Sequence, residues 1–224
     1  MLTAKYSIVI LLLCCMFVSG QRLHNAYREY ESSELFNSVD AEGSDKQAAL
    51  NAINLLEYQD IFGHPMVVNK YLLGYYYYTL LFDESDNQQL AFYFQNAYML
   101  FSQTIKQEPT NAKAWANLAL LTWLNTQSLD EILPYVKQAH QFGKYNFRVH
   151  VKLSQLAEWI VESQQPIAHL PSLQEILEHH LRFGLEDRRS KQAVLDIINL
   201  NQSNKEAICQ WLTTTDALKQ ARCD

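Results

Sequence analysis

Residues 96–121, NAYMLFSQTIKQEPTNAKAWANLALL, are the most informative part of the sequence about the fold, because they contain the end of one helix and the start of another. Apolar residues recur at intervals of three and four on both sides of its centre, as they do along an α-helix. Pro109 lies between the two runs, and proline lacks the amide proton that a continuing helix needs. The stretch therefore predicts a helix ending near Gln107 and a second one containing Trp115.

The same helical spacing extends over the rest of the chain. Only 6 glycines and 5 prolines interrupt the 224 residues, and no segment alternates apolar and polar residues by two as a half-buried strand does. We therefore predict an all-α fold of about ten helices, paired by short loops into antiparallel hairpins.

Capping and breaking residues predict several helix boundaries. Ser44 and Gln47 form a capping-box pattern, and Pro65 is expected in the first turn of the following helix. One helix is expected from Leu23 to Phe36, and a long one from Leu90 to Gln107.

A Phe-Gly pair ends two predicted helices, at Gly143 and at Gly184, 41 residues apart. We interpret the glycines as left-handed helix caps and expect each phenylalanine, Phe142 and Phe183, to fold back on the core. The separation of the two pairs is typical of helical repeats.

The run around Pro109 resembles the junction between tetratricopeptide repeats, in which small, aromatic, proline and tryptophan positions follow at set offsets. The residues that carry the resemblance are Gly74, Ala97, Phe101, Pro109, Trp115, Leu118 and Ala119. The resemblance implies a short solenoid of stacked hairpins, with small residues letting the helices approach. Thr104 and Thr122 depart from the pattern, and the spacing from Gly74 to Ala97 does not fit a repeat of about 34 residues. A plain helical bundle is the alternative.

The first twenty residues have the pattern of a secretory signal. Lys5 precedes an apolar stretch that ends at Val18, and small residues lie just before Gln21. The stretch is shorter than the roughly 20 residues of a membrane-spanning helix. We predict a signal peptide at 1–20, a single domain at 21–224 and export to the periplasm, with an uncleaved anchor in the inner membrane as the alternative.

Removal of a signal peptide would leave two of the four cysteines, Cys209 and Cys223. An even pair in an oxidising compartment predicts a disulfide, which would hold the C-terminal end in place. Two independent thiols are the alternative.

Charge and motifs argue against several functions. The net charge of -6 and the charged fraction of 19% make nucleic acid an unexpected partner. The sequence contains no phosphate-binding loop, nucleophile elbow or zinc-protease motif, so we expect no enzyme, cofactor or metal site. Glu175 and His179 could share a helix face as metal ligands, but no third ligand stands at a recognisable spacing, and a solvated face is the preferred interpretation.

Four aromatic residues are candidates for a binding groove. The first helices of tetratricopeptide-like hairpins line such a groove, and the resemblance places Tyr71, Tyr75 and Tyr78 on one face, with Trp123 facing inward from the next hairpin. Aromatic rings with polar tips can hold a protein partner or stack on sugars. Packing in the core is the alternative.

The whole chain has a second resemblance, carried by its signal pattern, its short repeat-like body and the segment CQWL at 209–212 followed by Cys223. It is similar to the exported VpsP-type proteins of bacterial exopolysaccharide biosynthesis. This implies a non-enzymatic scaffold or accessory role, with a polysaccharide polymerase, a ligase or an export component as protein partner. Direct binding of a glycan by the groove aromatics is the alternative.

Overall fold

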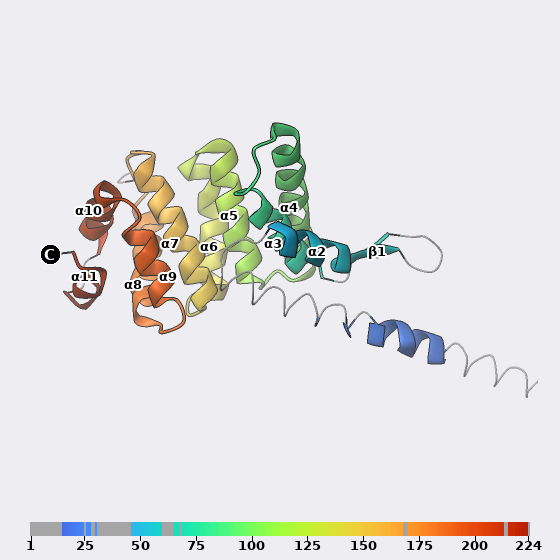
Figure 1. Cartoon of the computed structure of the whole chain (residues 1–224). Helices are drawn as coiled ribbons and strands as arrows, with labels where there is room; N and C mark the ends of the chain where they lie inside the picture. The colour runs from blue at the N-terminus through green and yellow to red at the C-terminus, as the bar shows by residue number, and fades with distance from the viewer. Residues whose placement is uncertain are drawn as a thin grey trace, which may run out of the picture. The chain divides into compact units, whose positions relative to one another are not determined.

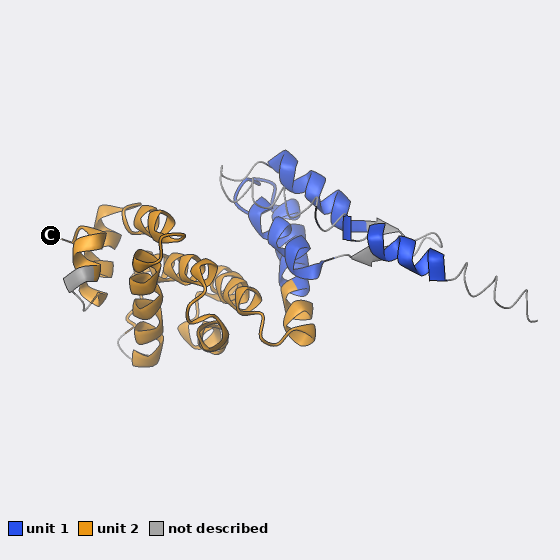
Figure 2. Ribbon diagram, turned by 90° about the horizontal axis from the view of Figure 1, so that it is seen from below, with its two compact units in different colours: residues 1–100 blue, residues 101–224 orange. Residues whose placement is uncertain are grey.

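The computed structural model describes residues 15–24, 26–27, 30, 46–59, 65–67, 69–167, 170–212 and 215–223. The chain forms two compact units, unit 1 at residues 1–100 and unit 2 at residues 101–224, which Figure 2 colours separately. Their boundary lies inside the helix α4 (Asn87–Gln107), and the single domain expected over 21–224 stays a prediction. A boundary inside a continuous helix has no linker composition that a sequence could display.

The predicted all-α class is confirmed (Figure 1). Besides α4, the labelled helices are α2 (Lys46–Leu56), α3 (Lys70–Leu80), α5 (Ala112–Thr126), α6 (Leu129–Gly143), α7 (Phe147–Glu162), α8 (Pro171–Glu186), α9 (Lys191–Ile198), α10 (Gln202–Trp211) and α11 (Thr215–Ala221). Of the predicted first helix, residues 23–24, 26–27 and 30 are helical, and 31–36 lie outside the described residues, as does Ser44.

A short antiparallel ribbon corrects the prediction for Pro65. Strand β1 (Glu57–Gln59) pairs with β2 (Pro65–Val67), so Pro65 begins a strand, where its missing amide proton is tolerated. Helix α3 starts only at Lys70, since the side chain of Asn69 accepts a hydrogen bond from the amide of Leu72 at 2.9 Å. Strands of three residues are too short to show an alternation in sequence.

The start of α4 also differs from the prediction. The helix begins at Asn87 rather than Leu90, because the Asp86 carboxylate accepts hydrogen bonds at 2.9 Å from the amides of Gln88 and Gln89. Its end at Gln107 is as predicted, and Pro109 follows in the turn.

Unit 2 is a stack of antiparallel hairpins, as the sequence predicts. Helix α5 pairs with α6, and α7 pairs with α8; α5 then packs on α7, and α6 on α8. Helix α9 covers α7 and α8, α10 contacts α7, and α11 contacts α8 (Figure 1). Membership of the tetratricopeptide family itself stays a prediction.

The residues of the repeat-like junction are mostly core residues. Ala97, Phe101, Leu118 and Ala119 are fully buried, and Gly74 is buried in α3. Trp115 is half-buried, and its indole N–H donates a 2.7 Å hydrogen bond to the carbonyl oxygen of the exposed Pro109. This bond fixes the turn that leads into α5.

The two Phe-Gly pairs are not left-handed caps. Gly143 is the last residue of α6 and Gly184 lies inside α8, both without positive φ, and Phe142 is 38% exposed instead of packed on the core. The glycines serve close helix approach: a Cβ at Gly143 would lie 2.7 Å from the Cβ of Ala112 and 2.8 Å from a methyl of Val149. A left-handed cap does occur after α5, at Gln127.

We expect Gly143→Ala to destabilise unit 2 by about 1–2 kcal/mol, because overpacking costs about 1–3 kcal/mol and exceeds the helix-propensity gain of about 1 kcal/mol. Gly184→Ala should cost less, since its added Cβ comes closer than 3.0 Å only to a methyl of Val194. Urea unfolding followed by tryptophan fluorescence measures both, because all four tryptophans lie in unit 2. A Gly143→Ala variant more stable than wild type would contradict the packing argument.

The predicted disulfide is confirmed: Cys209 in α10 is bonded to Cys223, which follows α11. Cys15 is a free, exposed thiol. Among the helices that the structure describes, none is both long and apolar enough to cross a membrane. The first 14 residues of the predicted signal peptide lie outside the described part.

Candidate functional site

The predicted groove residues are largely buried. Tyr75, Tyr78 and Trp123 expose 6%, 4% and 3% of their surface, and Tyr71 is half-buried. Tyr75 packs against the ring of Tyr78 with 6.3 Å between the centroids. This burial favours the core-packing alternative for three of the four residues. The tyrosines belong to unit 1 and Trp123 to unit 2, so a groove shared by all four stays a prediction.

An open pocket lies in unit 2 beside the turn between α6 and α7, with a volume of about 550 Å³. We call it the turn pocket. Its lining combines aromatic rings, amide side chains and two cations: Gln141, Phe142, Gly143, Lys144, Tyr145, Asn146, Phe147 and Arg189. No carboxylate is among these eight residues. The volume is within the range of about 300–1,000 Å³ that is usual for ligand sites.

Arg189 reaches the turn pocket from the turn between α8 and α9. Its Nε and Nη2 donate hydrogen bonds to the two carboxylate oxygens of Asp187, at 3.1 and 2.7 Å, and its guanidinium carbon lies 4.5 Å from the centroid of the Phe147 ring. The hydrogen bonds from Arg189 lower the pKa of Asp187 to about 2, so this carboxylate is ionised at neutral pH. The guanidinium is therefore held in place before any ligand arrives.

Lys144 and Tyr145 form the exposed part of the pocket. Tyr145 is 67% exposed, and the Lys144 ammonium lies 5.8 Å from the centroid of its ring. Within the described residues, Lys144 has no carboxylate at ion-pair distance. An aromatic surface with an available cation is thus open to solvent.

Four histidines gather next to residues of the turn pocket, and we call them the histidine cluster: His140 of α6, His150 of α7, and His179 and His180 of α8. Nδ1 of His140 lies 3.2 Å from Nε2 of His180, and Nδ1 of His150 lies 2.8 Å from Nδ1 of His180. Both ring nitrogens of His180 therefore face another imidazole, and the three rings link three helices.

His180 can satisfy both of its ring nitrogens in the uncharged state. A neutral imidazole has one N–H donor and one acceptor nitrogen, so His180 can donate to one neighbour and accept from the other. Burial lowers the pKa of His180 to about 2 and that of His150 to about 4, and it also lowers the pKa values of His140 and His179. The histidines are neutral at pH 7.

His179 joins the cluster to the wall of the turn pocket. Its Nε2 lies 3.1 Å from the carbonyl oxygen of Lys144, and a carbonyl only accepts, so Nε2 carries the proton. The centroid of the His179 ring lies 4.3 Å from that of Phe183, and the Phe183 centroid lies 5.6 Å from that of Tyr145. These contacts brace the backbone and one aromatic side chain of the pocket.

In the part of the chain that is described, no three His, Cys, Asp or Glu side chains are placed to hold one ion. Glu175, the predicted helix-face neighbour of His179, is exposed, while His179 is half-buried beside Phe183.

Sequence reasoning did not find the histidine cluster or the turn pocket, although one signal was present. His140 and His180 precede the two Phe-Gly pairs at nearly the same distance, three and four residues before Gly143 and Gly184. This parallel would have indicated equivalent positions in successive hairpins.

Comparison of the chain with protein-family models, curated proteins and solved structures finds no match.

Proposed function

We propose that the protein is a non-enzymatic helical scaffold that binds a partner protein, with the turn pocket of unit 2 as the contact point. The observation that carries this proposal is the pocket itself, where Tyr145, Phe147 and Arg189 stand on braced turns. Tyrosine and arginine are among the residues that contribute most to binding at protein interfaces. Rigid placement reduces the entropy lost when a partner binds.

The contacts of the histidine cluster favour a structural role for these four residues. Five of the eight ring nitrogens of these histidines lie against another imidazole or against the Lys144 carbonyl, and these contacts join neighbouring helices. We therefore assign the cluster to holding α6, α7 and α8 together.

The proposed setting is the bacterial envelope. The Cys209–Cys223 disulfide supports an oxidising compartment, in line with the signal pattern at 1–20. The resemblance to VpsP-type proteins extends the proposal to surface polysaccharide assembly, with a polymerase, a ligase or an export component as the partner.

Crosslinking in intact cells of the native host, followed by capture of this protein and mass spectrometry, tests the scaffold function. We expect one envelope protein of polysaccharide assembly to be recovered in constant proportion to the captured chain. Recovery of the chain without any crosslinked protein, at full expression and with the disulfide intact, would reject a scaffold role.

A carbohydrate-binding function is the second candidate, and the exposed ring of Tyr145 is the observation that favours it. Neutral oligosaccharides would then bind with an affinity that Tyr145→Ala removes. Calorimetric titration decides between the candidates, because the scaffold function predicts no heat of saccharide binding.

A further inference from the structure

We propose that the turn pocket binds an acidic peptide segment of the partner, whose carboxylates pair with Lys144 and Arg189 and whose apolar side chain contacts the aromatic rings. This inference rests on the proposed scaffold function, because it takes the partner to be a protein. It goes further by naming the chemistry that the partner must present.

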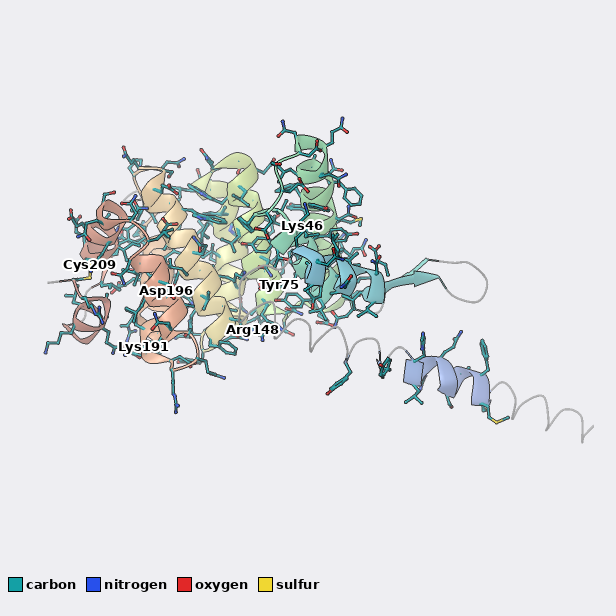
Figure 3. The ribbon with its side chains drawn as sticks, viewed as in Figure 1. Lys46, Tyr75, Arg148, Lys191, Asp196 and Cys209 are labelled. Atoms are coloured by element: carbon teal, nitrogen blue, oxygen red, sulfur yellow. A yellow bond between two sulfur atoms is a disulfide. The ribbon has the colours of Figure 1, made fainter. Side chains whose placement is uncertain are left out.

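The charge around the turn pocket is the first argument. Unit 2 as a whole contains equal numbers of basic and acidic residues, thirteen of each, and is therefore neutral. The two turns that build the pocket, taken together with the helix ends beside them, are not neutral, since residues 141–148 and 182–191 contain six cations and two carboxylates. These are Lys144, Arg148, Arg182, Arg188, Arg189 and Lys191, against Glu186 and Asp187. Figure 3 shows Arg148 and Lys191 at the same end of the unit 2 helices.

This local excess of positive charge predicts an anionic ligand. Both carboxylates already have partners. Oε1 of Glu186 lies 3.9 Å from Nη1 of Arg182, and Asp187 binds Arg189. An approaching carboxylate therefore meets the cations of the pocket lining, which contains no carboxylate of its own. Complementary charge of this kind raises association rates and excludes partners of the wrong sign.

The state of Arg189 is the second argument. A guanidinium has five N–H donors, and Asp187 receives two of them. The side chain is 62% exposed, and Phe147 supports its flat face. An arginine positioned in this way can offer its remaining donors to a carboxylate at little cost in side-chain entropy.

The aromatic residues favour a peptide over an inorganic anion. Phe142 is 38% exposed and Tyr145 67% exposed, and both line the pocket beside Phe147. A small anion would leave these rings in water, whereas an apolar side chain next to acidic residues would cover them. Burial of such rings is a main source of binding energy at interfaces.

Fluorescence anisotropy with a defined peptide tests the inference on the full chain. The probe is a labelled peptide with two glutamates on each side of a phenylalanine, and the control peptide has glutamines in their place. We expect the acidic peptide to bind and the glutamine peptide to bind at least about fivefold more weakly, with a loss of affinity as salt is added.

Lys144→Glu provides the decisive variant, with Lys137→Glu as its matched control. Lys137 is exposed on α6, is not part of the pocket lining and gives the same change in net charge. Lys144→Glu should weaken peptide binding by about five- to tenfold and Lys137→Glu by less than about twofold. Arg189→Gln should also weaken binding, and the urea midpoint of each variant shows that unit 2 remains folded.

Three outcomes would overturn the inference. They are no binding of the acidic peptide, an equal loss of peptide affinity in Lys144→Glu and Lys137→Glu, or binding of oligogalacturonate without binding of the peptide. The last result would identify an acidic saccharide as the ligand. Partner capture separates this inference from the scaffold function. If Lys144→Glu captures the partner as well as wild type does, the acidic-peptide inference is rejected and the scaffold function stands. If wild type itself captures no partner, the scaffold function is rejected.

Discussion

Lowering the pH from 7 to 5 is expected to reduce the free energy of unfolding of unit 2 by about 2–4 kcal/mol. In the unfolded chain a histidine has a pKa near 6.5. In the folded chain burial lowers the pKa of His150 to about 4 and that of His180 to about 2. Between pH 6.5 and 4 the unfolded state therefore binds more protons, so stability is present above pH 6.5 and is lost as the pH falls.

The charged groups around the histidine cluster act in both directions. Lys144, Arg182 and Arg189 disfavour a positive charge on His150 or His179, while Asp187 and Glu186 favour it. Burial outweighs these contributions for both histidines. Outside the cluster, burial raises the pKa of Glu158, and this carboxyl opposes the effect because its own contribution becomes more favourable as the pH falls.

Urea unfolding at several pH values, followed by tryptophan fluorescence, measures the loss. His180→Leu should be less stable than wild type at pH 7 by about 1–3 kcal/mol, since it leaves nitrogens of His140 and His150 without their partner. The variant should also lose stability less steeply as the pH falls. The slope of its free energy of unfolding against pH should be smaller than that of wild type by up to about 1.4 kcal/mol per pH unit, because one titrating histidine has been removed.

His24→Leu provides the control, because His24 lies in unit 1 and should leave the pH dependence of unit 2 unchanged. If the unfolding midpoint of wild type stays constant from pH 7 to pH 5, the folded and unfolded chains bind the same number of protons in this range, and the prediction is wrong.

Replacing both Cys209 and Cys223 by serine is expected to lower stability by about 3 kcal/mol, the loop-closure entropy for a sequence separation of 14 residues. The effect should concentrate at the C-terminal end. Helix α11 has seven residues, and a helix of that length is not stable without tertiary contacts. The disulfide ties it to α10 and keeps it near α8, which it contacts.

Helix α10 has a second attachment, because the Asn204 side chain donates a buried 2.8 Å hydrogen bond to the Glu158 carboxylate of α7. Without the disulfide we therefore expect α11 to be cleaved first in limited proteolysis, with α10 retained on unit 2. The urea midpoint and the mass of the protected fragment measure the two effects. Cys15→Ser, made like the double variant in the full chain that retains residues 1–20, removes a thiol outside the disulfide and serves as the control. Unchanged stability and proteolysis in the double variant would reject the stapling role.

Features that depend on neighbouring residues could be predicted from the sequence. The end of α4 at Gln107 and the turn at Pro109 follow from helical spacing and from a missing amide proton. The disulfide was equally predictable, because Cys209 and Cys223 remain as a pair once the apolar N-terminal segment is set aside. Each of these inferences uses local chemistry or a simple count, and none depends on which helices are in contact.

Features that depend on contacts between distant helices became visible in the folded chain alone. Gly143 looks like a cap in sequence, but its role comes from Ala112 and Val149, which press against it. Likewise, His140 and His180 are 40 residues apart, yet their nitrogens lie 3.2 Å from each other because α6 packs on α8. The turn pocket arises in the same way, when Arg189 is brought to the turn after α6. Burial, pKa and pocket shape are properties of these contacts, which helical periodicity alone does not specify.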